Sequence, residues 1–348
     1  MSAAQYAYLH TRVSLYAEHL LGIDRLNTLI DRIPDKYPLA PDIASPSTAA
    51  SQYSGELDQD NVSILLKELA VLIRPLSGAP RGLLDYWAHR FELGNLKTII
   101  RGKMANQSQQ AIEEQLLDMG GFTSLPLTEL LQSDTTAELL RRLEQTPYAE
   151  IARRARSLLE GGEALFALDA ALDRRYFAGL ARRGSEVGNA SGQLLRTIIG
   201  SIIDRVNLVW LLRYRFAYNL PPAQAYYLLI PANQRLTAPQ LQQLAQCTTF
   251  DEAIASLPQP FDKLLAGARN NTEVTLKLEH ETWRIAGNVL KHGTFNVARA
   301  FAYMILRERD LRRLRAITRG RDMQMDAGMI RAALGLTSPD GEQPTGLH

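Results

Sequence analysis

The 348-residue chain has little cysteine, little net charge and no long uninterrupted apolar run. Cys247 is its single cysteine, which excludes a disulfide within the chain and a thiolate metal cluster. Lysine and arginine number 39 against 37 aspartate and glutamate, so the net charge is only +2. A strongly cationic nucleic-acid binder is therefore not suggested. Sparse cysteine fits a reducing, cytoplasmic compartment.

The most apolar segment, residues 197–212, is interrupted near its middle by Asp204, Arg205 and Asn207. Because such side chains are costly in lipid, this segment predicts a buried helix rather than a membrane span. The N-terminus lacks a basic start followed by an apolar block, and we expect no signal peptide. Any link to a membrane would then pass through a partner.

Motifs of catalysis are also missing. The sequence contains no Gly-x-Gly-x-x-Gly, no Walker-type loop and no Gly-x-Ser-x-Gly elbow. His280 and Glu281 begin like the zinc-protease motif His-Glu-x-x-His, but Arg284 occupies the position of the second histidine. We therefore predict no enzyme activity, and no catalytic, cofactor-binding or metal-binding residues.

Apolar residues instead recur at helical spacing along most of the chain, which predicts an all-α fold. Thr135 and Thr249 each precede a glutamate by three residues, the spacing of a capping box at a helix start. Residues 34–60 hold four prolines and little periodicity, which predicts a long surface loop, and the tail after residue 336 has the same character. The expected long helices span residues 6–30, 62–74, 82–104, 163–183, 193–218, 273–290 and 296–319.

Three windows align without gaps and begin at residues 92, 204 and 310, about 110 residues apart. They read ELGNLKTIIRGK, DRVNLVWLLRYR and DLRRLRAITRGR. Each opens on an acid, with leucine four residues later, isoleucine or leucine seven later, arginine nine later and a base eleven later. A further match joins residues 172–177 to residues 278–283. The recurrence predicts an internal triplication into three similar helical domains, at 1–150 (with the loop), 151–268 and 269–348 (with the frayed tail).

On a helix the acid, the two apolar residues and the last base share one stripe, whereas the arginine nine residues after the acid points to the opposite side. That arginine should face another element or a partner. The alternative is that all these charges are structural ion pairs and solvated helix ends. The candidate partner-binding residues are Arg101, Lys103, Arg213, Arg215, Arg319 and Arg321.

The segment 307–321 is the most basic in the chain and could bind nucleic acid through phosphate contacts. However, it also contains Glu308 and Asp310, and its apolar residues are spaced for packing. We therefore favour a packed helix with a basic outer face. The runner-up function is a soluble helical scaffold that binds protein or nucleic acid through this segment.

Together the windows and the helical pattern resemble the C subunit of the V/A-type ATPases, the counterpart of the d subunit of eukaryotic vacuolar ATPases (the AC39 family). The resemblance covers about residues 6–335 and is clearest at 90–103 (RFELGNLKTIIRGK) and 300–320 (AFAYMILRERDLRRLRAITRG). The chain departs from the pattern in the long loop and at Arg313, where the other two windows have asparagine.

This resemblance implies a non-catalytic coupling protein without a cofactor. Three similar helical domains would form a funnel of pseudo-threefold symmetry on the cytoplasmic face of the membrane. The funnel would sit on the proteolipid ring and receive the foot of the central shaft, which the D and F subunits form, in ATP-linked ion transport. Membrane contact would then occur only through the ring, and no nucleic acid is expected as a partner.

Overall fold

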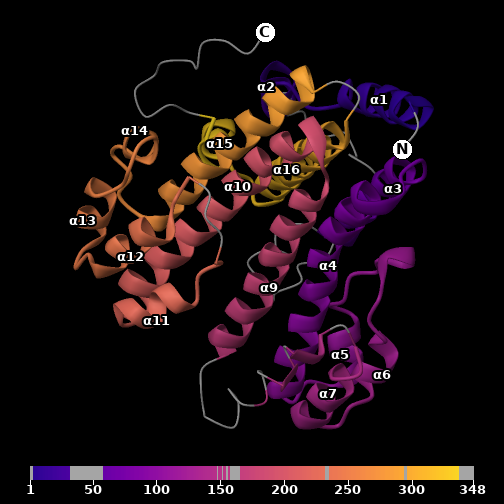
Figure 1. Ribbon diagram of the computed structural model, residues 1–348, viewed down its shortest axis with the longest axis vertical. Coiled ribbons are helices and arrows are strands. Elements are labelled where there is room, and N and C mark those ends of the chain that lie inside the picture. The colour runs from indigo at the N-terminus through magenta and orange to yellow at the C-terminus, as the bar shows by residue number, and fades with distance from the viewer. Residues whose placement is uncertain are drawn as a thin grey trace.

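The computed structural model describes residues 3–31, 58–146, 148–150, 152–153, 156, 165–231, 235–293 and 296–336. Within these ranges the chain is helical and contains no strand, which confirms the all-α prediction (Figure 1). Most of the expected loop at 34–60 and the tail after residue 336 lie outside the described residues. The elements in chain order are α1 (Ala3–Ala17), α2 (Ile23–Asp31), α3 (Gln59–Ile73), α4 (Gly78–Met104), α5 (Gln109–Glu113), η1 (Gly120–Phe122), α6 (Leu127–Leu131), α7 (Thr136–Leu143), α9 (Leu165–Glu186), α10 (Asn189–Leu212), η2 (Arg213–Ala217), α11 (Pro222–Tyr227), α12 (Ala238–Gln246), α13 (Phe250–Ala255), α14 (Phe261–Leu264), α15 (Asn271–His292), α16 (Val297–Asp322) and α17 (Ala327–Ala333).

Six helices form the body of the molecule, and each contacts the next in a closed cycle: α3, α4, α9, α10, α15, α16 and back to α3. Ion pairs link neighbouring helices at three positions of this cycle, and all three run in the same direction around it. In each, an acid on α3, α9 or α15 pairs with a base on the long helix that precedes it in the cycle. The pairs are Asp173 with Lys97, Glu279 with Arg205 at 2.6 Å, and Glu68 with Arg307 at 3.1 Å.

The short helices lie outside this six-helix ring. Figure 1 shows α5, α6 and α7 together beside one end of α4, and α11 to α14 gathered on the other side of the molecule. Helix α1 packs on α16, and α2 packs on α17, where Leu26 and Ile30 share a small apolar cluster with Ile317 and Ile330. The N-terminal helices therefore contact elements that the sequence places in the third domain. The boundaries at residues 150 and 268 stay a prediction.

Each long helix that carries a recurring window ends at a residue with left-handed backbone: Asn106 after α4, Asn219 after α10 and Gln324 after α16. Asn219 lies one residue further from its window's acid than the other two. The π-helical turn η2 takes up that extra residue, as π-bulges do. The expected helix 193–218 is therefore α-helical only to Leu212.

The expected helix 6–30 is wrong in one respect, because α1 ends at Ala17 and α2 begins at Ile23. The main-chain amide of Leu21 donates to the carboxylate of Asp310 at 2.7 Å, a contact that a continuous helix would not permit. The other expected long helices correspond to α3, α4, α9, α10, α15 and α16.

Both expected capping residues accept the amide proton of a glutamate at 3.2 Å, Thr135 that of Glu138 and Thr249 that of Glu252. The two carboxylates reach back one residue further than expected. They accept from the amides of Asp134 and Thr248, rather than from the capping residues themselves.

Substitution of two glycines of α4 should have opposite effects on stability. A Cβ at Gly102 would lie 2.5 Å from Cγ1 of buried Ile112, whereas a Cβ at Gly82 would meet nothing within 4 Å. We expect Gly102→Ala to lower the free energy of unfolding by about 1–3 kcal/mol through overpacking. Gly82→Ala should raise it by about 0.5–1 kcal/mol through helix propensity. Urea unfolding of both variants checks this, and equal effects would contradict it.

Candidate partner interface at the ends of the long helices

The acid that opens each window is buried and accepts a main-chain amide proton from a leucine two residues before a short helix. A buried carboxylate is tolerated when donors of this kind satisfy it. These acids thus fix the starts of the short helices on the long ones. The pairs are Glu92 with Leu125 before α6 at 2.8 Å, Asp204 with Leu236 before α12 at 3.2 Å, and Asp310 with Leu21 before α2 at 2.7 Å.

The base eleven residues later binds carbonyl oxygens at the other end of the same short helix. Eleven residues of α-helix rise about 16 Å, enough to reach both ends of helices this short. An acid at the start and a base at the end also complement the dipole of the short helix. We call each acid–base pair a bracket. The bases of the three brackets bind main-chain carbonyl oxygens as follows: Lys103 that of Leu131 at 2.6 Å, Arg215 those of Ala245 at 2.6 Å and Cys247 at 3.1 Å, and Arg321 that of Leu29.

Asparagines in the first two windows form a second repeated contact. Asn95 donates to the carbonyl oxygen of Leu117 at 2.7 Å and accepts from its amide at 2.8 Å. Asn207 does the same with Ile230, at 3.1 and 2.8 Å. Arg313, at the third position, has no acceptor atom for such an exchange, and its guanidinium lies 5.1 Å from the ring centre of Trp283 instead.

The arginines nine residues after the acids have different surroundings. Arg101 is half-buried and pairs with Asp169 of α9, so this arginine faces another element. Arg213 is half-buried and Arg319 is exposed, and neither has a side-chain hydrogen bond or ion pair to a described residue. Of the six candidates, these two leave their charge most available to a partner.

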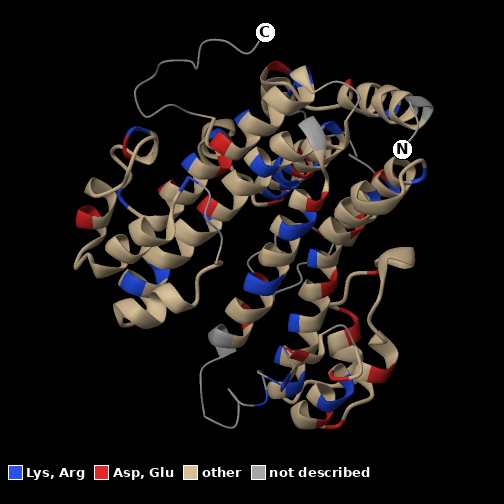
Figure 2. Ribbon diagram, in the orientation of Figure 1, with Lys and Arg blue, Asp and Glu red and all other residues tan. Residues whose placement is uncertain are grey.

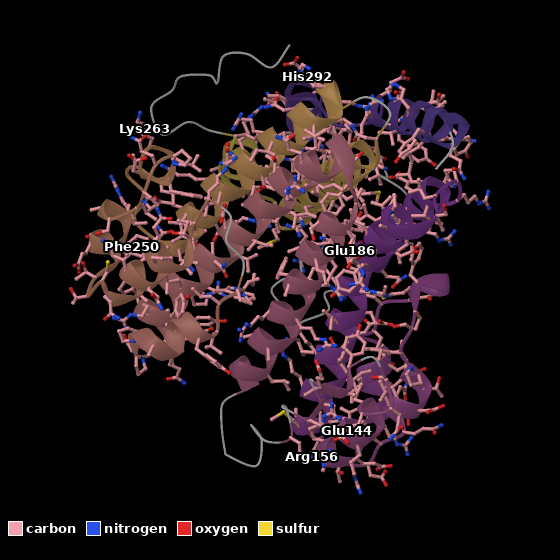
Figure 3. All side chains as sticks on the ribbon, in the orientation of Figure 1. Glu144, Arg156, Glu186, Phe250, Lys263 and His292 are labelled. Atoms are coloured by element: carbon pink, nitrogen blue, oxygen red, sulfur yellow. The ribbon has the colours of Figure 1, made fainter. Side chains whose placement is uncertain are left out.

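Large apolar side chains lie exposed close to these arginines. Met104 ends α4, Tyr218 follows η2 and Met323 follows α16, and their exposed fractions are 41%, 45% and 72%. Each of the three long-helix ends thus combines basic and apolar groups on its surface. Among the labelled side chains of Figure 3, Phe250 and Lys263 belong to the short helices α13 and α14.

The basic segment 307–321 lies within α16, and most of its arginines bind groups inside the chain. Arg307 pairs with Glu68, Arg309 with Asp310 at 2.7 Å, and Arg315 with Asp58 at 3.4 Å. Figure 2 shows acidic residues interspersed with the basic ones along the long helices. The basic outer face expected of this segment is thus largely turned inward, which leaves little charge for nucleic-acid phosphates.

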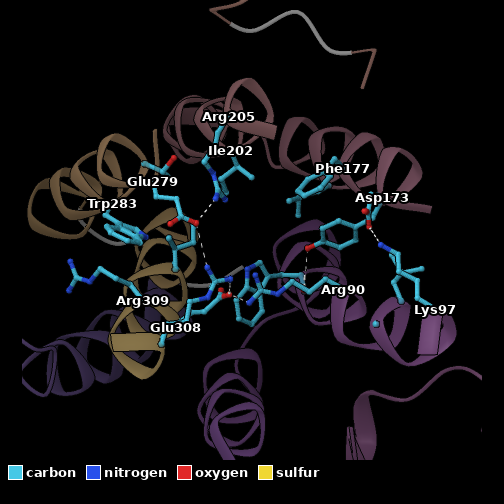
Figure 4. Close-up of a pocket in the computed structure, with 18 residues that line it drawn as sticks. Arg90, Lys97, Asp173, Phe177, Ile202, Arg205, Glu279, Trp283, Glu308 and Arg309 are labelled. Atoms are coloured by element: carbon cyan, nitrogen blue, oxygen red, sulfur yellow. Dashed lines mark hydrogen bonds and ion pairs between the residues drawn. The ribbon is translucent and has the colours of Figure 1, made fainter. Parts of the chain in front are cut away.

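A narrow cavity of about 70 Å³ lies where α4, α9, α10, α15 and α16 meet (Figure 4). This volume is well below the roughly 300–1,000 Å³ of typical cofactor or ligand pockets. The charged residues that line this cavity form no recognisable pattern in the sequence, because they come together only when the helices pack. Its charged lining residues are Arg90, Lys97, Arg205, Arg309, Arg312, Asp173, Glu279 and Glu308.

Burial and nearby polar or charged groups act in opposite directions on the pKa values of two buried carboxyl groups, Glu308 at the cavity and Asp204 in the second bracket. Burial tends to raise the pKa of Glu308, but Arg90 and Arg312 outweigh it, and the pKa lies below its ordinary value. For Asp204, burial outweighs the amides of Leu236 and Arg235 and raises the pKa to about 6. The described residues contain no group of three histidine, cysteine or acidic side chains that could hold a metal ion.

No helix among the described residues has the length and the apolar character needed to cross a membrane. A family model described as ATP synthase (C/AC39) subunit matches residues 46–333. The chain belongs to this family. The match spans all six helices of the ring and both residues of each bracket.

Three relatives from archaea are each named as the C subunit of an A-type ATP synthase. The protein of Methanosarcina mazei is 26% identical over 95% of this chain and 93% of its own length. That of Methanocaldococcus jannaschii is 24% identical over 95% and 86%, and that of Halobacterium salinarum is 25% identical over 78% of both chains. The resemblance inferred from the windows is thereby confirmed.

The raised pKa of Asp204 predicts an unusual pH dependence of this C/AC39 protein. Because the folded state holds the Asp204 proton more tightly than the unfolded state, the stability that this proton contributes is present at low pH and lost as pH rises through about 6. Relative to Asp204→Asn, the wild type should lose about 2–3 kcal/mol between pH 4 and 6.5. Urea unfolding of both proteins across this range measures the difference, and a constant difference would refute the assignment.

The third bracket predicts that substitutions of two arginines of α16 lower the free energy of unfolding by unequal amounts. Arg321→Met removes the charged donor to the carbonyl oxygen of Leu29 and should lower the free energy of unfolding by about 1–3 kcal/mol, as loss of a charge-assisted hydrogen bond does. Arg319→Met is the matched control, and an exposed substitution should stay within about 0.5 kcal/mol. Urea unfolding decides, and a larger loss in Arg319→Met would contradict the bracket.

Proposed function

We propose that this chain is a non-catalytic central-stalk subunit of a rotary V/A-type ATPase that couples the D/F shaft to the proteolipid ring. Membership in the C/AC39 family and the naming of the relatives as C subunits of A-type ATP synthases support a subunit of a rotary ATPase. The coupling role is a more specific proposal than membership in the family, and its support is the arrangement of the helices.

The observation that carries the proposal is the closed six-helix ring with its repeated side-chain contacts. A coupling part must pass torque without bending, and helices closed into a cycle have no free edge at which they could separate. The charge pairs from α9 to α4, from α15 to α10 and from α3 to α16 recur in cyclic order. This order is what three similar domains around a pseudo-threefold axis would give, and it fits a funnel about that axis.

The long-helix ends supply the contact surface of the proposal. A ring of identical subunits presents the same surface repeatedly, so a partner with similar contacts at several positions can engage it at each. The ends of α4, η2 and α16 each carry basic residues beside an exposed methionine or tyrosine. In this proposal the protein lies on the cytoplasmic face, and the ring mediates its contact with the membrane.

Charge reversal at the two available arginines tests the interface. We expect Arg213→Glu combined with Arg319→Glu to weaken binding to the shaft pair or to the ring about tenfold at low salt, because exposed ion pairs contribute about 0.2–1 kcal/mol each and reversal adds repulsion. Quantitative pull-down with the separately purified shaft pair and ring is the measurement.

The matched control is Arg182→Glu on α9, whose side chain is 68% exposed and lies 3.9 Å from Glu186. Circular dichroism of all variants should match that of the wild type. Unchanged binding of the double variant would remove these two arginines from the interface. If the wild type itself bound neither partner, the coupling role would be abandoned.

A further inference from the structure

A surface groove lies where the end of α3, the first half of α4 and the segment at η1 meet. Residues within 70–74, 81–89 and 121–124 line it. Its volume is about 620 Å³, which lies within the roughly 300–1,000 Å³ of typical binding pockets. The groove is distinct from the long-helix ends and from the narrow central cavity, so no function described above uses it.

Two lining residues of α4 have counterparts on α16 at the same distance from the bracket acid. Arg81 and Asp85 precede Glu92 by eleven and seven residues, and residues 299 and 303 precede Asp310 by the same intervals. Both helices continue without a break from these positions to their acids. The two pairs therefore face the same side of their helices relative to the bracket.

On α16 these counterpart positions hold the helix α1 in place. Nη1 of Arg299 donates to Nδ1 of His10 at 2.8 Å and to Oγ of Ser14 at 3.0 Å. The ring of Tyr303 stacks on that of Tyr16, with 5.6 Å between the ring centres. On α4 the structure describes an open groove at the corresponding positions, beside the three-residue helix η1. The groove thus repeats part of a surface that already binds a helix elsewhere in the molecule.

The charges of the groove select the kind of helix that fits. Arg74 is exposed and has no side-chain hydrogen bond or ion pair to a described residue. The side chain of Arg81 is 48% exposed and lies 3.4 Å from Asp85. Burial lowers the pKa of His89, so this imidazole is neutral at pH 7. The lining therefore carries more positive than negative charge, and the charge of Arg74 is the one left without a partner.

We infer that this groove binds an amphipathic α-helix of a partner protein, with acidic residues of that helix facing Arg74 and Arg81. The contacts of α1 on α16 support a helical occupant, and the unpaired positive charge supports an acidic one. The helix α1 of a second copy of this chain does not meet this requirement, because Ala3–Ala17 contains no acidic residue. The inference is independent of the proposed function, since it uses neither the long-helix ends nor the bracket bases.

The test uses the full-length protein and a fluorescent synthetic peptide as the probe. The peptide has the sequence of α1 with His10→Glu and Ser14→Glu, because these two side chains contact Arg299, the counterpart of Arg81. The unchanged α1 peptide is the matched probe without acids. Fluorescence anisotropy at low salt should show saturable binding of the acidic peptide, about tenfold tighter than that of the unchanged peptide.

Substitutions in the groove locate the bound peptide. Arg74→Glu combined with Arg81→Glu should weaken binding of the acidic peptide about tenfold, because repulsion replaces attraction at both positions. Thr123→Trp places a large side chain in the groove without a change of charge, and it should also weaken binding. The matched controls are Thr128→Trp on α6 and Arg182→Glu on α9, both at exposed positions outside the groove, and they should bind like the wild type.

Each other outcome contradicts the inference in a different way. Absence of saturable binding by the wild type would remove the groove as a helix site. Equal affinity for the acidic and the unchanged peptide would point to α1 of a second copy instead of an acidic partner. Equal affinity of the wild type and the groove variants would place the peptide on α16 in exchange for α1. If the double arginine variant does not fold, Thr123→Trp against Thr128→Trp still decides.

Discussion

A buried carboxylate at the start of each window determines how the rest of the molecule is arranged. Glu92, Asp204 and Asp310 can remain buried because main-chain amides of another segment satisfy them. That requirement fixes each short helix on its long helix, and the base eleven residues later fixes the other end. Since both contacts go to main-chain atoms, the short helices can differ freely in sequence while the window recurs.

The positions of most helices could be predicted from the sequence because they depend on local periodicity and capping. The expected helix 273–290 is found as α15, and the hydroxyls of Thr135 and Thr249 cap as predicted. The break between α1 and α2 was not accessible, because its cause is Asp310, 289 residues along the chain. The π turn at η2 is visible only from comparison of where the three long helices end.

The candidate site was accessible only in part for the same reason. Spacing located the six recurring bases, and it also separated the arginines from the last bases by their side of the helix. It could not identify Leu131, Ala245 or Leu29 as acceptors, since these carbonyl groups belong to segments outside the windows. The central cluster around Arg90 and Glu308 has no signal in any single helix, because five helices must converge to create it.

The third bracket joins segments that lie 289 and 292 residues apart in the chain. Leu21 and Leu29 leave the ribosome long before Asp310 and Arg321 do. Until synthesis reaches Ile317 and Ile330, these residues cannot cover Leu26 and Ile30. A segment that is synthesised early but buried late keeps its apolar face exposed to water in the meantime. Such exposure slows folding and favours aggregation. The nascent chain therefore passes through a long interval in which a chaperone bound to residues 21–30 would keep this apolar face from aggregating.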